Sequence, residues 1–246
     1  MTKKAVLFDC DGVLINTEEI GYKILSKMLD DELISLGHQP PMYSREKYVE
    51  ILSGITYPQF VDRMKDDFKQ LTGSELSKSF FEKLGQKISA AEDTEMKAID
   101  GVKTLLTSLK SAGISFAVAS NSGAEGLERK LKKAGLYDYF LPHVYSRDDV
   151  QNEKPAPDMY LLASKKIGNF SPDECIVVED SVTGAKAGVA AGMYVIGFVG
   201  EQHRIDQEEA HLKKAGVSSI AYGMNEVLAE VFNLAGKQLP SNSHPT

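Results

Sequence analysis

The sequence predicts an α/β protein with a doubly wound, mostly parallel sheet and an inserted helical domain. Three observations support this prediction. From about Asp100 onward, short apolar segments alternate with segments of helical periodicity, which is the pattern of a parallel sheet. A separate apolar strand, Ala5–Phe8, precedes this region. The residues between them show helical periodicity and almost no strand signal, as expected of an insertion.

This pattern divides the chain into two domains and a tail. Residues 1–16 and 92–237 are assigned to a core domain, and residues 17–91 to a helical cap domain in which Ile20, Ile24 and Met28 keep an i, i+4 rhythm. An additional helical layer on the core is the alternative explanation of the cap. The polar tail, residues 238–246, contains Pro240 and Pro245, and we expect it to be disordered.

The core elements follow in order along the chain. Asp100 can cap a helix whose apolar face ends before Gly113, and a strand over residues 114–119 leads to Ser120. A second helix stops at Gly135, and Ser181 can cap a later one. Further strands are predicted over residues 143–145, 175–178 and 194–198, and further helices after residues 153–158 and over residues 225–234.

Composition limits the classes of function. A net charge of −7 without a Lys/Arg stripe argues against a nucleic-acid partner. Because no apolar run approaches the roughly 20 residues that cross a bilayer, we expect no membrane partner. Cys10 and Cys175 form neither a disulfide framework nor a zinc-binding spacing, which suits a reducing compartment. We therefore expect a cytoplasmic protein, and we take it to be a monomer.

Polar side chains follow several of the predicted strands. The carboxyl ends of parallel strands lie along one edge of a sheet, so a single pocket can collect these side chains. Two carboxylates at one strand end need a cation, and their hard oxygens favour magnesium. A carboxylate can approach a phosphate only where a cation offsets their repulsion. Carboxylates that lie together with a lysine and a metal ion therefore suit phosphoryl transfer. The polar side chains in question are those of Asp9, Asp11, Ser120, Asn121, Lys154, Glu179 and Asp180.

Each of these motifs also has an ordinary structural explanation. Asp11-Gly12 after an apolar run is typical of a turn, Ser120 of a helix cap, and Lys154 of a solvated loop. Acidic residues such as Glu179 and Asp180 are favourable at a helix start because of the helix dipole. Their joint occurrence at successive strand ends is what favours a functional site over these explanations.

As a set, the motifs resemble those of the haloacid dehalogenase superfamily hydrolases, in the helical-cap subgroup similar to β-phosphoglucomutase and sugar-phosphate phosphatases. The resemblance covers nearly the whole chain apart from the tail, and it implies a Rossmann-like core. The residues that carry it are Asp9-Cys10-Asp11-Gly12-Val13-Leu14, Ser120, Lys154 in Lys154-Pro155-Ala156-Pro157-Asp158, and Glu179-Asp180-Ser181.

The resemblance implies a two-step mechanism for hydrolysis of a phosphate ester. Asp9 would attack phosphorus and form an aspartyl-phosphate, which divides one difficult displacement into two easier ones. Asp11 would donate a proton to the leaving oxygen and later accept one from the attacking water. Ser120 and Lys154 would hold the oxygens of the transferred phosphoryl group.

The resemblance also implies a cofactor and a substrate. Mg²⁺ would bind Asp9, the Asp11 carbonyl and Asp180, with Glu179 either a ligand or an anchor for the ligands. The substrate would be a small phosphorylated metabolite, most simply a sugar phosphate. Asn121 and the cap residues Gly54 and Tyr57 are candidate substrate-binding residues.

Two other functions remain open at the level of sequence. The cap departs from the phosphomutase pattern, because Gly21 stands where the mutases place a histidine and Tyr57 where they place an arginine. A mutase must hold a second phosphate, so the loss of a cationic clamp favours hydrolysis. Asn16 also replaces the aspartate commonly found at the hinge. A phosphomutase and a non-catalytic protein that binds a phosphorylated ligand are the alternatives.

Overall fold

The computed structural model describes residues 2–52, 57–200 and 206–239, which form two compact units. One unit is Met1–Ile15 with Lys97–Thr246, and the other is Asn16–Met96. The predicted cap, residues 17–91, stops inside helix α4 (Lys78–Glu95), whose last turn is polar and carries no apolar signal. The predicted tail lies mostly outside the described residues, and the remainder of it is not in a helix or strand.

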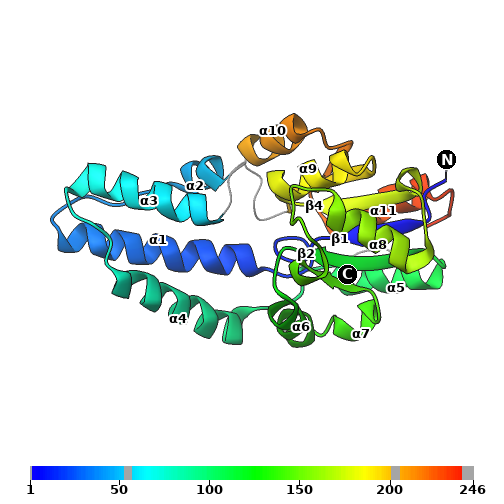
Figure 1. Cartoon of the computed structure of the whole chain (residues 1–246), viewed down its shortest axis with the longest axis horizontal. Coiled ribbons are helices and arrows are strands. Elements are labelled where there is room, and N and C mark those ends of the chain that lie inside the picture. The colour runs from blue at the N-terminus through cyan, green and yellow to red at the C-terminus, as the bar shows by residue number, and fades with distance from the viewer. Residues whose placement is uncertain (1, 53–56, 201–205, 240–246) are drawn as a thin grey trace. The chain divides into compact units, whose positions relative to one another are not determined.

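The first unit is built on a six-stranded sheet with the strand order β3-β2-β1-β4-β5-β6. Its strands β1, β2 and β4 are labelled in Figure 1. Its described strands all pair in parallel, which confirms the predicted fold class. Strands β2 and β3 extend the sheet on one side of β1, and strands β4, β5 and β6 extend it on the other side. The chain thus changes the direction in which it adds strands at β1, which pairs with both β2 and β4. Ligands of such sheets bind at the carboxyl ends of the strands beside this reversal. The strands are β1 Ala5–Phe8, β2 Ser115–Ser120, β3 Val144–Ser146, β4 Cys175–Glu179, β5 Tyr194–Phe198 and β6 Ser219–Ala221.

Side chains of β1 alternate between two apolar layers, because successive residues of a strand point to opposite faces of the sheet. Leu7 belongs to a buried cluster with Met159 and Leu212, which come from helices on one face. Phe8 packs edge-on against Phe140, whose helix lies on the other face. The helices of this unit are α5 Val102–Ser111, α6 Ala124–Lys133, α7 Tyr137–Phe140, α8 Asp158–Gly168, α9 Val182–Ala190, α10 Asp206–Ala215 and α11 Met224–Leu234, with short 3₁₀ turns at Arg147–Asp149 and Pro172–Glu174.

The second unit is helical, as the sequence predicts for the insertion. It consists of α1 Thr17–Ser35, α2 Arg45–Leu52, α3 Tyr57–Thr72 and α4. Leu29 and Leu33 of α1 pack with Phe60, Met64 and Phe68 of α3 in an apolar cluster separate from that of the sheet. The unit therefore has its own core, as expected of an inserted domain.

Several elements differ from their prediction. Helix α5 is capped by Gly101 with a φ of 85° rather than by the side chain of Asp100, so that predicted cap is wrong. Glycine is favoured there because other residues rarely adopt a positive φ. Strand β2 begins at Ser115 and includes Ser120, one residue later than predicted at both ends. Strand β6 and helix α10 were not predicted.

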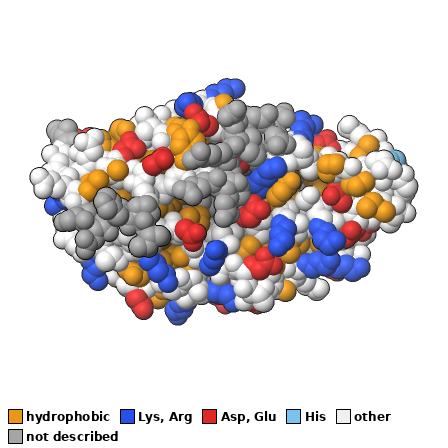
Figure 2. All heavy atoms as spheres, turned by 180° about the vertical axis from the view of Figure 1, so that it is seen from behind, with side chains coloured by type: hydrophobic (Ala, Val, Ile, Leu, Met, Phe, Trp, Pro, Cys, Tyr) orange, Lys and Arg blue, Asp and Glu red, His pale blue; other side chains and the backbone are white. Residues whose placement is uncertain are grey.

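Basic side chains lie beside acidic ones on the face shown in Figure 2. Within residues 2–52, 57–200 and 206–239, we find no helix that combines the length and apolar character needed to cross a membrane.

Candidate active site

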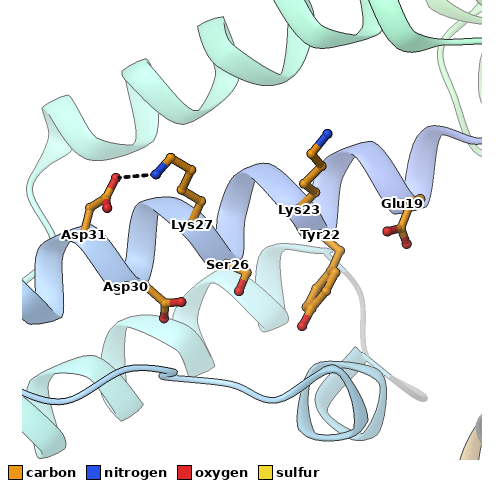
Figure 3. Close-up of a pocket in the computed structure, with 7 residues that line it drawn as sticks. All are labelled: Glu19, Tyr22, Lys23, Ser26, Lys27, Asp30 and Asp31. Atoms are coloured by element: carbon orange, nitrogen blue, oxygen red, sulfur yellow. Dashed lines mark ion pairs between the residues drawn. The ribbon is translucent and has the colours of Figure 1, made fainter.

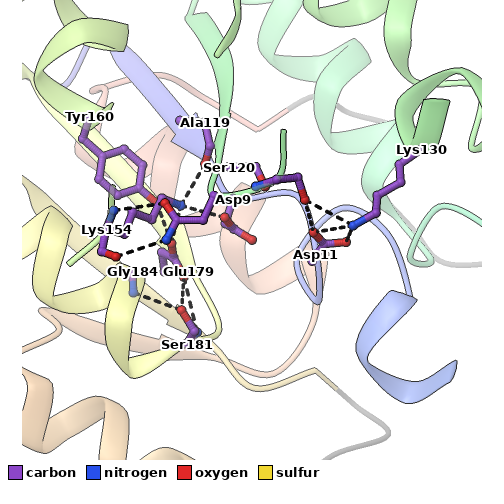
Figure 4. Close-up of polar contacts among 12 residues, drawn as sticks. Asp9, Asp11, Ala119, Ser120, Lys130, Lys154, Tyr160, Glu179, Ser181 and Gly184 are labelled. Carbon is purple, nitrogen blue, oxygen red and sulfur yellow. Dashed lines mark hydrogen bonds and ion pairs between the residues drawn. The ribbon is translucent and has the colours of Figure 1, made fainter. Parts of the chain in front are cut away.

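The centre of the candidate site is the ammonium group of Lys154, which lies between two carboxylates (Figure 4). Lys154 Nζ is 2.6 Å from Asp9 Oδ1 and 2.7 Å from Glu179 Oε1. It also donates to the Ala119 carbonyl at 2.8 Å and lies 2.9 Å from the Tyr160 hydroxyl. Residues from β1, β2, β4 and the loop before α8 therefore meet at the edge of the sheet where their strands end.

At each of Asp9 and Lys154, burial and the oppositely charged neighbours shift the pKa in opposite directions. Burial raises the pKa of Asp9 to about 7, although Lys154 acts to lower it. Burial acts to lower the pKa of Lys154, and the facing carboxylates Asp9 and Glu179 more than offset it, so this pKa lies above its usual value. Burial and the neighbouring Glu179 raise the pKa of Tyr160 well above normal, so its hydroxyl stays protonated and donates to Glu179 Oε1 at 2.6 Å.

Three carboxylates could hold a metal ion. One oxygen from each of Asp9, Glu179 and Asp180 lies within 4.8 Å of the others. A donor set made of carboxylate oxygens suits a hard divalent cation such as Mg²⁺. Lys154 pairs with Asp9 and Glu179, and a bound divalent cation would offset the remaining repulsion among the clustered carboxylates. The residues present thus fit the metal that the sequence predicts.

Glu179 is held by hydrogen-bond donors at both of its carboxylate oxygens. It is fully buried at the end of β4, and Lys154 and Tyr160 both contact its Oε1. Its Oε2 accepts from the Ser181 hydroxyl at 3.0 Å, and this hydroxyl in turn accepts from Gly184 N as the cap of α9. Hydrogen-bond donors contact both carboxylate oxygens of Glu179. This residue therefore anchors the site, in addition to any role as a metal ligand.

Ser120 is the last residue of β2 and Asn121 follows it, and the side chains of both contact the backbone. Ser120 is buried, and its hydroxyl accepts from Ser122 N at 3.1 Å. The Asn121 side chain donates to the Lys154 carbonyl at 3.1 Å and accepts from Lys154 N at 3.0 Å. The substrate-binding role of Asn121 stays a prediction, and these contacts show that it also fixes the loop that carries Lys154.

Asp11 has a separate set of contacts. Lys130 Nζ, from α6, lies 2.7 Å from its Oδ1 and 2.8 Å from its Oδ2. The Ser122 hydroxyl donates to its Oδ2 at 3.0 Å. The two aspartates that flank Cys10 are therefore held by different lysines, Asp9 by Lys154 and Asp11 by Lys130.

Two glycines allow carboxylates of the site to approach the backbone closely. Gly12 has a φ of +77°, and a Cβ added there would lie 1.8 Å from Asp180 Oδ2. A Cβ added at Gly184, in the first turn of α9, would lie 1.7 Å from Glu179 Oε1. Both positions need glycine because the space that a side chain would fill holds a carboxylate.

The Gly184→Ala variant should therefore be less stable than the wild type. Alanine normally stabilises a helix interior relative to glycine by up to about 1 kcal/mol, but here it would displace Glu179, and overpacking of this kind costs about 1–3 kcal/mol. Gly126→Ala in α6 is the matched control, since its added Cβ would meet no atom within 4 Å. Urea denaturation should show a lower free energy of unfolding for Gly184→Ala only, and equal stabilisation by both changes would contradict this account.

The predicted cap residues cannot be placed in the site. Gly54 lies outside the described residues, and Tyr57 begins α3 with a side chain that is not described. The helical unit does contain a surface hollow of about 400 Å³ along α1 (Figure 3). It is lined by Glu19, Tyr22, Lys23, Ser26, Lys27, Asp30 and Asp31. None of the candidate site residues is among them, so this hollow gives no support to the predicted roles of Gly54 and Tyr57.

Lys130, Ser122 and Tyr160 contact the site but were not predicted. Tyr160 lies in the first turn of α8, directly after the Lys154 loop, so its place in the chain could have indicated it. Lys130 contacts Asp11 although the two residues are 119 positions apart in sequence, and Ser122 contacts Asp11 from 111 positions away. Nothing in the local sequence pattern indicates contacts of this range.

Comparisons with known proteins agree with this architecture. A family model described as haloacid dehalogenase-like hydrolase matches residues 6–198. The 6-phosphogluconate phosphatase of Escherichia coli is 28% identical, over a region that covers 81% of this chain and 84% of the relative's chain. The phosphorylated carbohydrates phosphatase of Thermotoga maritima is also 28% identical, over 88% of this chain and 94% of the relative's chain. A crystal structure of a HAD family hydrolase from Deinococcus radiodurans, with bound phosphate and sodium, superposes with a TM-score of 0.80 at 29% identity and covers 97% of this chain and 99% of its own.

Proposed function

The chain belongs to the family of haloacid dehalogenase-like hydrolases, and on that premise we propose that it is a Mg²⁺-dependent phosphatase of a small phosphorylated metabolite, most simply a sugar phosphate. The observation that carries the proposal is the position of Lys154 between Asp9 and Glu179, with Asp180 beside them. A nucleophilic carboxylate, an ammonium group and a cluster of metal-binding oxygens are what transfer of a phosphoryl group to a carboxylate requires.

In the proposed first step, Asp9 attacks the phosphorus atom of the substrate. The new bond joins an Asp9 oxygen to phosphorus, and the bond from phosphorus to the ester oxygen breaks. Asp11 donates a proton to that leaving oxygen. Lys154 neutralises negative charge around the transferring group, and Ser120 donates to one of its oxygens.

In the proposed second step, water attacks the phosphorus atom of the aspartyl-phosphate. Asp11, now ionised, accepts a proton from this water, and Asp9 leaves as a free carboxylate. Inorganic phosphate is released, and both aspartates return to their starting state. A divalent cation bound by Asp9, Asp180 and the Asp11 carbonyl, with Glu179 as ligand or anchor, would withdraw electrons from the phosphoryl oxygens in both steps.

Magnesium affinity should weaken as the pH falls below about 7. Burial raises the pKa of Asp9 to about 7 in the metal-free protein, so below that pH a proton competes with the metal for this carboxylate. Titration calorimetry should show an affinity about tenfold weaker for each pH unit below 7. The amide of Asp9→Asn does not titrate in this pH range, so this variant should bind Mg²⁺ weakly and with little dependence on pH. Equal affinity of the wild type at about pH 6 and about pH 8 would contradict the assignment of Asp9 as a ligand.

The substrate class rests on the relatives, whose names include a 6-phosphogluconate phosphatase and a phosphatase of phosphorylated carbohydrates. The test is a panel of sugar, nucleotide and short-chain acid phosphates, assayed for released inorganic phosphate with Mg²⁺ and with EDTA. We expect metal-dependent release, with sugar phosphates among the best substrates. Isomerised hexose phosphate without free phosphate would identify a mutase instead. Binding of phosphorylated ligands without turnover of any would identify a non-catalytic protein.

A further inference from the structure

We propose that Lys130 is a positioning residue for the proton transfer at Asp11, and that Ser122 assists it. This inference rests on the proposed function, in which Asp11 is the acid and base, and extends it to a lysine outside the motifs of the sequence. Lys130 lies in α6, on the opposite side of Asp11 from the cluster around Lys154, as Figure 4 shows.

The contacts of Lys130 fix the Asp11 carboxylate in one orientation. Its ammonium group bridges both carboxylate oxygens, at 2.7 Å and 2.8 Å, and the Ser122 hydroxyl donates to one of them. Lys130 Nζ is also 3.3 Å from Ser122 Oγ, so the three groups form a closed cluster. A carboxylate held by donors on both oxygens cannot rotate freely about its side-chain bonds.

Lys130 itself is anchored by the packing of α6. Leu127 and Leu131 of this helix are fully buried, and Lys130 lies next to Leu131, at the rim of the buried face. Its side chain is 16% exposed. Lys132, two residues later, is 57% exposed and pairs with Glu128 of the same helix. Lys130 therefore differs from its neighbour in burial and in its partner.

The arrangement gives the two aspartates different chemistry. Asp9 contacts Lys154 and shares a metal-binding cluster with Glu179 and Asp180, whereas Asp11 contacts Lys130. Two carboxylates in different environments can take different roles in one reaction. When Asp11 donates its proton to the leaving oxygen, it becomes ionised. In that state both of its oxygens can accept from Lys130 and one can accept from Ser122, and the adjacent ammonium stabilises the new charge. Lys130 would thus aid the departure of leaving groups that need a proton.

Leaving-group dependence tests this inference. Phenyl phosphate and p-nitrophenyl phosphate are similar in shape, but nitrophenolate leaves readily without a proton and phenolate does not. We expect Lys130→Met to lower kcat/KM for phenyl phosphate by about a hundredfold and for p-nitrophenyl phosphate by only a few-fold. Ser122→Ala should show the same selectivity with a smaller loss. Lys130→Arg should recover much of the lost activity, and Lys132→Met should leave both rates unchanged.

The outcomes separate a positioning role from a structural one. Equal losses on both substrates, in variants whose thermal unfolding matches the wild type, would show a structural role and overturn the inference. No loss on either substrate would also overturn it. Should Lys130→Met fail to fold, Lys130→Gln and Ser122→Ala carry the same comparison.

Asp11→Asn separates failure of this inference from failure of the proposed function. We expect it to show the same selectivity as Lys130→Met, with a larger loss. If Asp11→Asn is selective and Lys130→Met is not, Lys130 is not a positioning residue, although the proposed function stands. If neither variant is selective, Asp11 is not the proton donor. If the wild type hydrolyses neither substrate, the proposed function and this inference fail together.

Discussion

Asp9→Asn is expected to lower phosphate release by about 10⁴-fold or more while the protein stays folded. An amide is a far weaker nucleophile than a carboxylate, so the proposed bond to phosphorus cannot form at a useful rate. The substitution keeps the size of the side chain and leaves an oxygen facing Lys154 Nζ, which is 2.6 Å from Asp9 Oδ1. Released phosphate from the best substrate of the panel, measured with saturating Mg²⁺, gives the size of the loss.

The control for this variant is Asp138→Asn, which makes the same chemical change at an exposed position of α7. It should release phosphate at the wild-type rate. Thermal unfolding of both variants should stay near that of the wild type, because neither change creates a cavity and Lys154 keeps Glu179 as its counter-ion in Asp9→Asn. Phosphate release by Asp9→Asn at more than about a tenth of the wild-type rate would exclude Asp9 as the nucleophile.

Lys154→Met is expected to lower the free energy of unfolding by about 3–5 kcal/mol and to abolish turnover. The Lys154 side chain is 3% exposed and that of Glu179 is fully buried, so removing the ammonium group leaves buried carboxylates without their counter-ion. The Tyr160 hydroxyl and the Ala119 carbonyl would lose a donor as well. Urea denaturation at neutral pH measures the loss of stability.

The stability deficit of Lys154→Met should shrink in acid. Lys154 acts to lower the pKa of Asp9, so its loss should raise that pKa further above the unfolded value. A carboxyl group with a raised pKa stabilises the fold below its unfolded pKa, and this contribution is lost as the pH rises through the folded pKa. The deficit should therefore be smaller at about pH 5 than at about pH 8. Lys166→Met, at an exposed position of α8, is the control, and a deficit below about 1 kcal/mol at neutral pH would contradict the buried ion cluster.

The central strands were predictable because their signals are strong and local. Strand β1 and residues 175–178 of β4 are continuous apolar runs, each followed directly by an acidic residue. Strand β6 has three residues, of which only Ile220 and Ala221 are apolar, and it lies at the edge of the sheet, so its sequence signal is weak. Helix α10 is dominated by charged residues and has little apolar periodicity to indicate it.

The sequence could predict that the candidate site residues lie close together, because a topological rule places the ends of parallel strands side by side. Asp9, Ser120 and Glu179 stand at the carboxyl ends of parallel strands, and such ends share one edge of a sheet. The pairing of Asp11 with Lys130 was not predictable, because it depends on how α6 packs rather than on any strand end. The substrate-binding roles of the cap residues Gly54 and Tyr57 stay predictions, because Gly54 lies outside the described residues and the side chain of Tyr57 is not described.

The most direct test is to locate the phosphoryl group on the enzyme during turnover. The protein would be mixed with its best substrate and Mg²⁺, quenched in acid within one turnover, digested and analysed by peptide mass spectrometry. The account predicts a phosphoryl group on the peptide that contains Asp9, and none on that peptide in Asp9→Asn. Rapid release of phosphate with an unmodified Asp9 peptide, or with the phosphoryl group on another residue, would contradict it.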